Sequence, residues 1–435
     1  MKYSRIFAFM VLAGLATGAQ ATNGYFSHGY GMKAKGMAGA STTNTEDAFG
    51  GANNPASMAY AGNRFDLGVD LFSPKRSASR SGSVGLDGSM DSDSDYFLIP
   101  EIGYNKMIGS NLSLGVTVYG NGGMNTNYPG DQLPAGFCGP GAPSSNALCG
   151  QGRLGVDLMQ LIVAPTVAFK VAPNHSIGIS PLLGYQRFKA EGLQAFAGFS
   201  SSPANLTNRG YDDAYGYGVR LGYLGKITPT VTIGAAYASK MNFDEFSKYS
   251  GLFAEQGDFD IPSNFNVGVS WQTMPALRLA LDYQRINYSD INSVGNPTSN
   301  LFLGRPLGAD NGPGFGWDDM NIWKLGMEYK YSPKLTLRAG YSHTNSPIKG
   351  DLNPACPATA SANCGEVVFN VLAPAVIENH VTLGFTYTMP SGGELSVAYM
   401  HAFENDVSGS DPFFGGTGNI KMYQNSLGIQ YSWKM

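Results

Sequence analysis

Residues Thr22–Tyr60 read TNGYFSHGYGMKAKGMAGASTTNTEDAFGGANNPASMAY, and the rest of the chain is interpreted around them. The stretch is dense in glycine and alanine. Glycine at this density disfavours helix and strand alike, because ordering it costs more chain entropy than ordering other residues. The stretch also carries apolar side chains such as Tyr25, Phe26 and Phe49, so it is not a solvated linker. We therefore expect a compact, irregular plug whose walls are supplied by something else.

The chain after residue 62 alternates between apolar residues and small or polar ones. In one run, Val381, Leu383 and Phe385 alternate with threonine and glycine. A period of two with one apolar face indicates a half-buried strand. Fourteen such strands are predicted, at 63–73, 93–107, 110–120, 153–172, 174–190, 211–226, 229–243, 259–273, 276–290, 317–332, 334–348, 376–389, 393–406 and 418–435.

The connections between these runs alternate in length. Six are tight turns, and seven are long loops at 74–92, 121–152, 191–210, 244–258, 291–316, 349–375 and 407–417. An even strand number with alternating short and long connections is typical of outer-membrane barrels. We predict an all-β fold, a 14-stranded antiparallel transmembrane β-barrel over 63–435, with residues 22–62 as an N-terminal hatch (plug) in its lumen. The short turns and both termini are then expected to be periplasmic.

The composition agrees with a membrane barrel better than with a soluble all-β protein, which is the alternative. Charged residues make up 14% of the chain, against about 25% in ordinary soluble domains. A soluble sandwich would also show charge at its outward positions, whereas the second set of alternating positions here is mostly Gly, Ser, Thr and Ala. The formal net charge of −4 argues against nucleic acid as a partner, which needs a basic patch.

Residues 1–21 have the features of a secretory signal peptide. Lys2 and Arg5 precede the apolar run 6–15, and Ala19-Gln20-Ala21 is a small-x-small cleavage site. An uncleaved anchor is the alternative, but the run is too short to span a bilayer. Export of this kind, together with the barrel pattern, predicts the bacterial outer membrane as the location.

The four cysteines form two close pairs, Cys138 with Cys149 and Cys356 with Cys364. An exported chain meets an oxidising compartment, where disulfides persist. Four cysteines allow three connectivities, and we expect the local pairing, which closes two short loops. A metal site would need closer cysteine spacing or histidines nearby, and the sequence has neither.

The start of the mature chain carries a family resemblance. Asn23–Gly31 and Lys35–Ala40 open the glycine-rich stretch, and the triplet Asn54-Pro55-Ala56 closes it. With the strand count, these features resemble the FadL/TodX family of outer-membrane transporters for long-chain fatty acids and aromatic hydrocarbons. The resemblance spans the mature chain. It implies passive uptake of hydrophobic small molecules, with Asn54, Pro55 and Ala56 as hatch residues.

The resemblance also implies a route for the ligand. The long extracellular loops capture it, the hatch rearranges, and the ligand leaves sideways through a wall gap near a kink in the third strand. The third strand here is predicted at 110–120. Gly115 and Gly120 are the candidate kink residues, because glycine permits bulges and leaves space where a side chain would lie. For Gly120, a simple strand end is an equal alternative.

Two loops contain many apolar residues and are candidates for ligand capture, 121–152 and 191–210. Apolar residues exposed in long loops often mark binding surfaces. Phe137 and Phe196 are the residues we expect to contact the ligand. The alternative is that the apolar residues pack the loops against each other.

Arg220, Arg278 and Arg338 are directed towards the lumen by the alternation, as are several carboxylates. A buried arginine would suit recognition of a carboxylate. The alternative is an ion-pair network that braces a roomy lumen. A basic pocket would favour fatty acids as substrates, and an apolar pocket without an unpaired base would favour hydrocarbons such as monoaromatics.

The sequence carries no enzyme signature. Its five histidines lie far apart, and it has neither an H-E-x-x-H nor a G-x-S-x-G motif. The acidic run 91–95 lacks the glycine and glutamate of a calcium loop. We expect no catalysis, no metal and no cofactor. The expected partners are a hydrophobic small molecule, membrane lipid with lipopolysaccharide, and the barrel-assembly machinery, and the chain is expected to be a monomer.

A surface adhesin or receptor is the main rival function. Such a protein would use the long loops and keep the lumen closed, so it predicts a hatch held by many polar contacts and no apolar cavity. A general porin is the third option. It predicts an open water path, which the plug should block.

Overall fold

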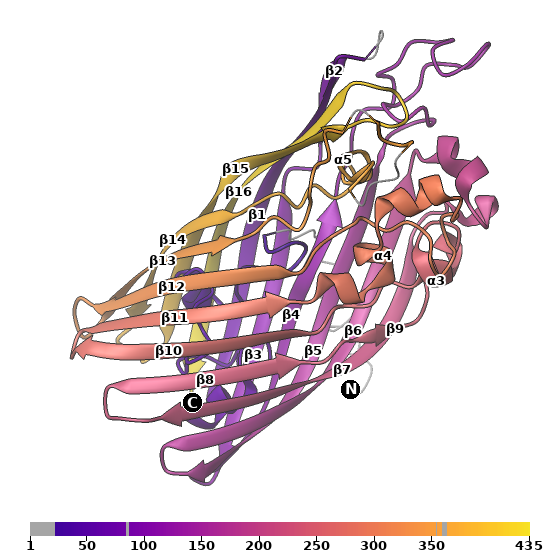
Figure 1. Ribbon diagram of the computed structural model, residues 1–435. Helices are drawn as coiled ribbons and strands as arrows, with labels where there is room; N and C mark the ends of the chain where they lie inside the picture. Colours follow the sequence, from indigo (N-terminus) through magenta and orange to yellow (C-terminus); the bar gives the residue numbers. More distant parts are fainter. Residues whose placement is uncertain (1–21, 84–86, 354, 359–362) are drawn as a thin grey trace.

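The computed structural model describes residues 22–83, 87–353, 355–358 and 363–435. The predicted signal peptide at 1–21 lies outside the described residues. The described chain forms one antiparallel sheet that closes on itself, because β1 pairs with β3 on one side and with β16 on the other (Figure 1). Of the sixteen strands, β2 and β9 are short additions to the loop ends of β1 and β7. The other fourteen form the ring, which confirms the predicted fold class.

The strands of the ring follow one another around the barrel in chain order. Their bounds are β1 Arg64–Ser81, β2 Gly88–Asp91, β3 Phe97–Ile108, β4 Leu112–Asn125, β5 Gly155–Ala172, β6 His175–Glu191, β7 Asp212–Lys226, β8 Val231–Ala238, β9 Asn242–Phe243, β10 Asn264–Met274, β11 Leu277–Ile286, β12 Met320–Lys330, β13 Leu335–Thr344, β14 Asn379–Thr388, β15 Glu394–Ser410 and β16 Thr417–Lys434.

Helices are short and lie in the hatch and the long connections. They are α2 Met32–Lys35, η1 Pro55–Tyr60, η2 Gln194–Phe199, η3 Pro203–Asn205, η4 Ser247–Tyr249, α3 Ala254–Gly257, η5 Tyr288–Asp290, α4 Asn292–Gly295, η6 Thr298–Leu303 and α5 Glu366–Phe369. Within the described part of the chain, none is long and apolar enough to cross a bilayer.

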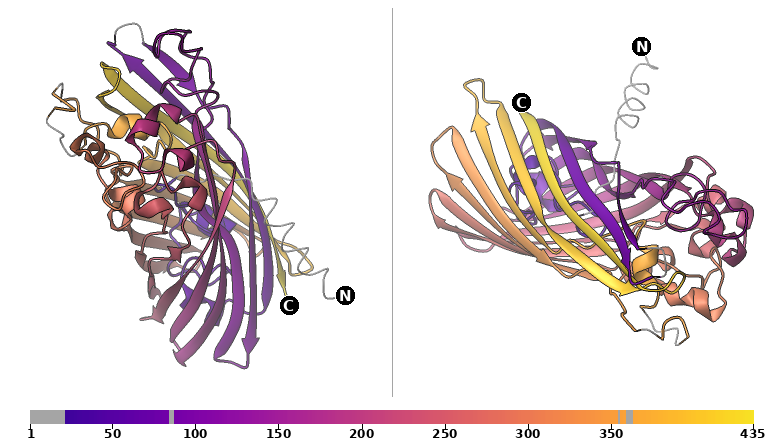
Figure 2. Two further views of the ribbon diagram at one scale, coloured as in Figure 1. Left: turned by 90° about the vertical axis from the view of Figure 1, so that its right-hand side faces the viewer. Right: turned by 90° about the horizontal axis from the view of Figure 1, so that it is seen from above.

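The two ends of the barrel differ in their connections. The end that carries the six short connections is called the turn end here, and the end that carries the long ones is called the loop end (Figure 1). At the loop end, short helices and irregular segments fold over the mouth of the barrel (Figure 2). The last strand, β16, finishes at the turn end, where Lys434 pairs with Arg64.

Some predicted strand boundaries are wrong at the loop end. The first strand reaches Ser81 rather than 73, and the third reaches Asn125 rather than 120, so parts of the loops predicted at 74–92 and 121–152 are strand. Conversely, the strands predicted to begin at 259 and 317 begin later. Residues 259–263 and 317–319 lie before β10 and β12. Strands that project beyond a membrane have no lipid to face, so they lose the apolar alternation used to find them.

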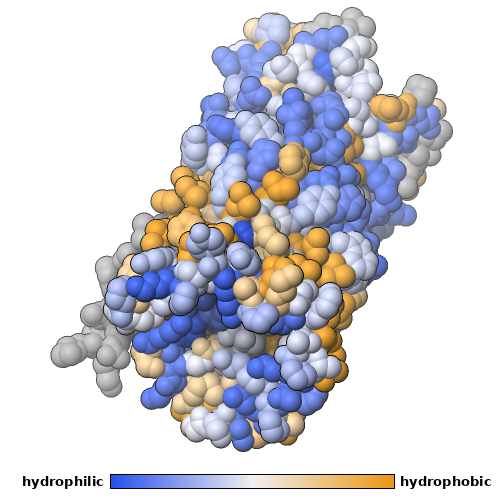
Figure 3. Space-filling view, turned by 90° about the vertical axis from the view of Figure 1, so that its left-hand side faces the viewer, coloured by the Kyte–Doolittle hydropathy of each residue, from blue (hydrophilic) through white to orange (hydrophobic). Residues whose placement is uncertain are grey.

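The outer wall of the barrel carries an apolar band. Outward side chains such as Leu71, Leu183 and Leu383 are 41%, 53% and 64% exposed, respectively. In the space-filling view, hydrophobic residues gather across the middle of the face, and hydrophilic residues dominate its upper part (Figure 3). Large apolar side chains exposed around a closed sheet need lipid against them. The band therefore marks the membrane-spanning part of the wall.

The hatch lies inside the barrel and is held by carboxylates of the wall. Asp282 of β11 accepts hydrogen bonds from the backbone N–H groups of Ser41 and Thr42, each at 2.8 Å. Lys35 of the hatch forms ion pairs with Asp70 at 2.7 Å and with Glu101 at 3.0 Å. These groups are buried, so the charges stabilise the hatch position without competition from bulk water.

Glycines in the wall let the hatch approach the strands closely. At Gly340 in β13, a Cβ atom would lie 2.3 Å from the carbonyl carbon of Met37 and 2.4 Å from the backbone nitrogen of Ala38. Contacts this short to backbone atoms cannot be relieved by rotating a side chain. Gly340 is therefore needed for the hatch to sit where it does.

Replacing Gly340 with valine should displace the hatch and leave the barrel closed. We expect the variant to keep the heat-modifiable migration of a folded barrel on gels, and its hatch to be cut several-fold faster by added protease. Gly198→Val is the matched control, because a Cβ atom there has nothing within 4 Å. Wild-type protection of the hatch in the Gly340 variant would contradict this account of its packing.

Candidate functional site

An apolar cavity lies under the long connections at the loop end. The space between its lining side chains measures ≈ 580 Å³, part of it open to solvent. Five separate connections and the start of β5 contribute its walls. The lining residues are Leu148, Val156, Leu193, Phe196, Leu206, Leu252, Phe253, Ser293, Leu307, Pro313, Gly314, Phe315, Val368, Phe369 and Leu372. None of them is charged, and the hydroxyl of Ser293 is already bonded to backbone carbonyl groups.

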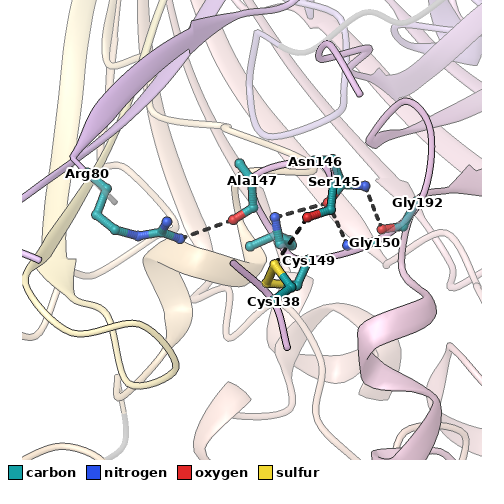
Figure 4. Close-up of a disulfide and its surroundings, with 9 residues drawn as sticks. Arg80, Cys138, Ser145, Asn146, Ala147, Cys149, Gly150 and Gly192 are labelled. Carbon is teal, nitrogen blue, oxygen red and sulfur yellow. Dashed lines mark hydrogen bonds between the residues drawn. A yellow bond between two sulfur atoms is a disulfide. The ribbon is translucent and has the colours of Figure 1, made fainter. Parts of the chain in front are cut away.

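The disulfide between Cys138 and Cys149 closes the loop that supplies Leu148 to this cavity (Figure 4). Within that loop, the Asn146 side chain accepts hydrogen bonds from the backbone N–H groups of Leu148 and Gly150, and it donates one to the carbonyl of Gly192 on the neighbouring connection. Asn146 therefore positions Leu148 and joins two of the cavity's walls. The second predicted disulfide, between Cys356 and Cys364, is also present.

The second disulfide is followed at once by α5, which supplies Val368 and Phe369 to the cavity. Glu366 at the start of α5 is buried, and its carboxylate accepts a hydrogen bond from the backbone N–H of Lys349. The pKa of Glu366 is raised from its ordinary value of 4.5 to about 8, mainly by burial and in part by the nearby charge of Asp318. The packed loop thus favours the neutral carboxyl group over the charged one.

A chain of aromatic contacts leads from the cavity to the start of the hatch. Phe253 in the cavity wall lies 4.8 Å from Phe259, ring centre to ring centre, and Phe259 lies 5.9 Å from Tyr25. On the other side, Phe315 of the cavity lies 6.0 Å from Trp317, which lies 5.8 Å from Tyr25. Both routes converge on Tyr25, so the first residues of the hatch form the floor beneath the apolar region.

The wall beside that floor contains a gap in strand pairing. β3 and β4 pair only from the Ile102–Val118 pair to the turn. Beyond it, residues 97–101 of β3 still pair with β1, and residues 119–125 of β4 still pair with β5, but the described structure shows no ladder between them. Outward from the gap lies the apolar band, with Leu98 50% exposed. The gap therefore opens at the level of lipid.

An irregularity in β4 accompanies the gap. The pairing of β4 with β5 shifts between Gly120 and Gly122, so Asn121 is an extra residue on the β4 side. Such a bulge bends its strand and ends regular pairing. The bulge lies next to Gly120, one of the two glycines proposed for a kink. Gly115 pairs in regular register on both sides and packs against Met58 of the hatch, so the shift does not involve it.

The first residues of the hatch close the gap from inside. The backbone N–H of Ser27 donates to the carbonyl of Asn121 at 3.1 Å, and the N–H of Gly123 donates to the carbonyl of Tyr25 at 3.0 Å. Gly122 permits this approach, because a Cβ atom there would lie 1.6 Å from the Tyr25 carbonyl oxygen. The hatch thus adds a short strand to the free edge of β4.

Connections at the loop end close the top of the gap. The backbone N–H of Asp93 donates to the carbonyl of Asn127 at 3.0 Å. The guanidinium of Arg76 on β1 reaches the carbonyls of Asn125 and Ser94. Arg76 is buried and forms no ion pair within the described residues. The sequence interpretation missed it because position 76 was assigned to a loop.

The hatch triplet lies against β6 and β7. Asn54 caps η1 by accepting from the backbone N–H of Ala56, and its amide donates to the carbonyl of Tyr223 at 2.9 Å. Pro55 is the first residue of η1, and the carbonyl of Ala56 accepts from the hydroxyl of Ser176 at 2.8 Å. The triplet therefore anchors the end of the hatch away from the gap.

The three lumen arginines have different surroundings. Arg338 forms ion pairs with Glu328 at 2.7 Å and with Glu46 of the hatch at 2.8 Å, and Arg278 pairs with Glu328 at 3.2 Å. Arg220 is buried and donates to the carbonyl of Gly51 at 3.2 Å, but it forms no ion pair within the described residues.

The two phenylalanines proposed for ligand capture also differ. Phe196 is 7% exposed, lines the cavity and packs edge-on against Phe369 at 5.8 Å. Phe137 is 38% exposed and does not line it. Most of the other lining residues come from connections that the sequence interpretation left without a role. These residues share one signal in the sequence, because they are apolar residues in loops too long to be simple turns. That signal does not show which loops come together.

Replacing Asn146 with alanine should loosen the loop that carries Leu148. The change removes hydrogen bonds to buried backbone groups, each worth about 1–3 kcal/mol when a partner is left unsatisfied. We expect weaker binding of a hydrophobic fluorescent probe, by about tenfold, in a variant whose barrel folds normally. Asn242→Ala is the control, because Asn242 is exposed on β9. Equal affinity in both variants would show that Asn146 does not shape the cavity.

The packing of α5 should depend on pH. Because the pKa of Glu366 is raised to about 8, the packed loop is most stable at acidic pH, below the ordinary value, and loses stability as the pH rises towards 8. Limited proteolysis of this loop should therefore be faster at pH 8 than at pH 5, and Glu366→Gln should remove the difference. A pH dependence that survives in the glutamine variant would assign it to another group.

Comparisons with known proteins agree with this architecture. Solved structures similar to the chain include the toluene transporter TodX of P. putida, with a TM-score of 0.65 and 17% identity, covering 94% of this chain and 99% of that one. A FadL homologue of Pseudomonas aeruginosa has a TM-score of 0.68 and 15% identity over the same shares. The toluene transporter TbuX of Ralstonia pickettii has a TM-score of 0.62 and 17% identity, also over those shares. No curated protein sequence matches the chain. The model of the family described as outer membrane protein transport protein (OMPP1/FadL/TodX) matches residues 10–361, so the chain belongs to that family of outer-membrane transport proteins.

Proposed function

We propose that this protein takes up hydrophobic small molecules passively across the outer membrane, through the loop cavity and the gap between β3 and β4. The observation that carries the proposal is that an uncharged cavity at the loop end is joined by aromatic contacts to a wall gap that the first residues of the hatch close from inside. On this proposal the signal peptide is removed, and the turn end and the C-terminus are periplasmic. The protein has no catalytic role.

The first step is capture in the cavity. A hydrophobic molecule gains free energy on leaving water, about 25 cal/mol for each Å² of apolar surface removed. The cavity offers phenylalanine, leucine and valine side chains from several connections, so it can surround a small ligand on most sides. No energy source is needed for this step, because the ligand moves down its own gradient of free energy.

The second step is release into the membrane. The aromatic contacts around Tyr25 give the ligand an apolar route to the gap. Two neutral backbone hydrogen bonds join residues 25–27 to the edge of β4. By contrast, the hatch beyond Gly31 is held by buried ion pairs. Opening of residues 22–30 alone would therefore free the gap while the rest of the hatch stays in place and keeps water out.

Neutral hydrocarbons, including monoaromatics of the kind named for TodX, suit the cavity better than carboxylates do. A carboxylate buried there would lack a counter-charge, and an unpaired buried charge is costly. Long-chain fatty acids remain the second candidate class because of Arg220, which lies deeper and forms no ion pair within the described residues. The two classes thus predict different residues as determinants of affinity.

The adhesin alternative receives mixed support. The many polar contacts of the hatch match its expectation of a fixed plug. The apolar cavity contradicts its expectation that no apolar cavity is present. We therefore favour transport.

The proposal is tested by binding and uptake with the mature protein in liposomes. A fluorescent long-chain fatty acid serves as the probe, with toluene and an alkane as competitors. We expect saturable binding that toluene displaces, and about tenfold weaker binding in Phe196→Ala. Phe199→Ala in the same loop is the matched control, since Phe199 is 48% exposed and does not line the cavity. Binding that toluene leaves intact but Arg220→Gln abolishes would assign fatty acids instead.

The gap is tested by locking it. Ser27→Cys with Asn121→Cys places two thiols on paired segments, and their disulfide should stop uptake without lowering binding. Reductant should restore uptake in this variant, and wild type treated with the same reductant controls for the two native disulfides. Undiminished uptake by the oxidised variant would exclude this gap as the exit, and no saturable binding of any apolar molecule would favour the adhesin.

A further inference from the structure

The first residues of the hatch are held by a side chain from a long connection, Tyr288 of η5. Its hydroxyl group donates a hydrogen bond to the carbonyl of Asn23 at 2.6 Å and accepts one from the backbone N–H of Tyr25 at 3.1 Å. Tyr288 and both of its partners are buried. One hydroxyl group therefore clamps the hatch backbone on either side of Gly24.

Gly24 permits this close approach. Its φ of +64° lies in the left-handed region, and a Cβ atom there would lie 2.5 Å from the hydroxyl oxygen of Tyr288. A larger residue would therefore push the hatch and Tyr288 apart. The ring of Tyr288 also packs edge-on against the rings of Tyr25 and Phe26, at 5.0 Å and 5.9 Å between ring centres. The clamp thus combines hydrogen bonds with aromatic packing.

The clamp and the wall gap share one hatch residue. Tyr25 donates its N–H to Tyr288, and its carbonyl accepts from the N–H of Gly123 on β4 at 3.0 Å. Because both bonds belong to one residue, moving Tyr25 away from β4 also stretches its bond to Tyr288. The clamp therefore opposes opening of the gap.

Tyr288 belongs to a connection that forms part of the cavity wall. It begins η5, and Ser293 of α4 and Phe315 further along the same connection line the cavity. Backbone hydrogen bonds join the clamp to this wall. The N–H of Ile291 donates to the carbonyl of Tyr288 at 3.2 Å, and the N–H of Val294 donates to the carbonyl of Ile291 at 2.9 Å. Movement of the wall would therefore move Tyr288.

Trp317 joins the clamp to a second wall of the cavity. Its ring lies edge-on to that of Tyr288 at 5.2 Å, and its backbone N–H donates to the carbonyl of Val294 at 3.0 Å. The indole N–H of Trp317 donates to the side chain of Asn370 at 2.6 Å. Asn370 directly follows α5, which supplies Phe369 to the cavity. The position of Tyr288 thus depends on two of the walls that a ligand would touch.

We propose that Tyr288 is the positioning residue that couples occupancy of the cavity to opening of the gap. In the empty protein its hydroxyl group holds Tyr25 on the edge of β4. A ligand between the walls favours a position of the connection in which both hydrogen bonds of the hydroxyl group are broken. The ligand shifts this equilibrium only by as much as it binds the second position better. The coupling rests on the proposed function, whereas the clamp on the ligand-free hatch does not.

The clamp is tested by the reactivity of a thiol at residue 27 of the mature protein in liposomes. Ser27 is buried, and the four native cysteines are paired in disulfides, so N-ethylmaleimide reaches the thiol of Ser27→Cys when the hatch opens. Without ligand, we expect labelling to be about tenfold faster once Tyr288→Phe is added, because a buried N–H then loses its acceptor. Toluene should accelerate labelling several-fold in the protein that keeps Tyr288, and have little effect in the phenylalanine variant.

Tyr249→Phe is the matched control. The buried hydroxyl group of Tyr249 donates to the carbonyl of Gly210, which lies outside the hatch, so its loss should leave labelling unchanged. Gly24→Ala displaces the same clamp by steric contact and should reproduce the fast labelling of Tyr288→Phe. Heat-modifiable migration on gels verifies that each variant is a closed barrel.

The outcomes separate the clamp from its coupling and from transport. Equal ligand-free labelling with and without Tyr288→Phe, or equally fast labelling of the Tyr249 control, would overturn the clamp. Equal acceleration by toluene in both proteins, or in neither, would overturn the coupling. Binding of toluene is measured separately, by displacement of the fluorescent fatty acid. Absence of saturable binding would reject the proposed function and the coupling with it, while the ligand-free comparison still decides the clamp.

Discussion

Backbone pairing around the ring is the constraint on which this structure depends. In lipid, each strand must satisfy its N–H and C=O groups on both sides, because an unpaired group there costs several kcal/mol. β1 and β16 meet this demand by closing the sheet. Between β3 and β4 the ladder stops at the Ile102–Val118 pair, and the hatch supplies part of what is missing. Because the hatch completes the wall at this point, movement of the hatch would open the wall.

The interior shows how the same chain stabilises a plug without filling the lumen with apolar side chains. Carboxylates from the wall accept hydrogen bonds from hatch backbone groups, and lysines of α2 reach back to the wall. Glycines on the strands let backbone approach backbone. Charge therefore gathers around the hatch, whereas the cavity above it is free of charge. Two of the three lumen arginines contact the hatch, Arg338 through Glu46 and Arg220 through the carbonyl of Gly51, whereas Arg278 pairs with Glu328 of the wall.

The sequence predicted the barrel well, because lipid on one face and a polar lumen on the other produce a period of two along each strand. The strand count and the closed ring follow from it, and the plug was expected from the glycine-rich composition of residues 22–60. The loop ends of β1 and β4 were placed too short, since beyond the membrane the alternation fades at residues such as Pro74 and Gly122. The cavity could not be predicted, because its walls come from distant connections that meet only through contacts such as Asn146 with Gly192. Arg76 was missed because position 76, which lies in β1, was assigned to a loop.

The division of the hatch between neutral and ionic contacts has a mechanical consequence. Pulled from Thr22, the segment 22–30 would release its hydrogen bonds to β4, to the hydroxyl of Tyr288 and to the ammonium group of Lys324, but no ion pair within the described residues. At Gly31 the pull meets the carboxylate of Glu101, and soon afterwards the ion pairs of Lys33 and Lys35. Displacement of the hatch would stop there, because moving it further would require breaking its ion pairs with the wall.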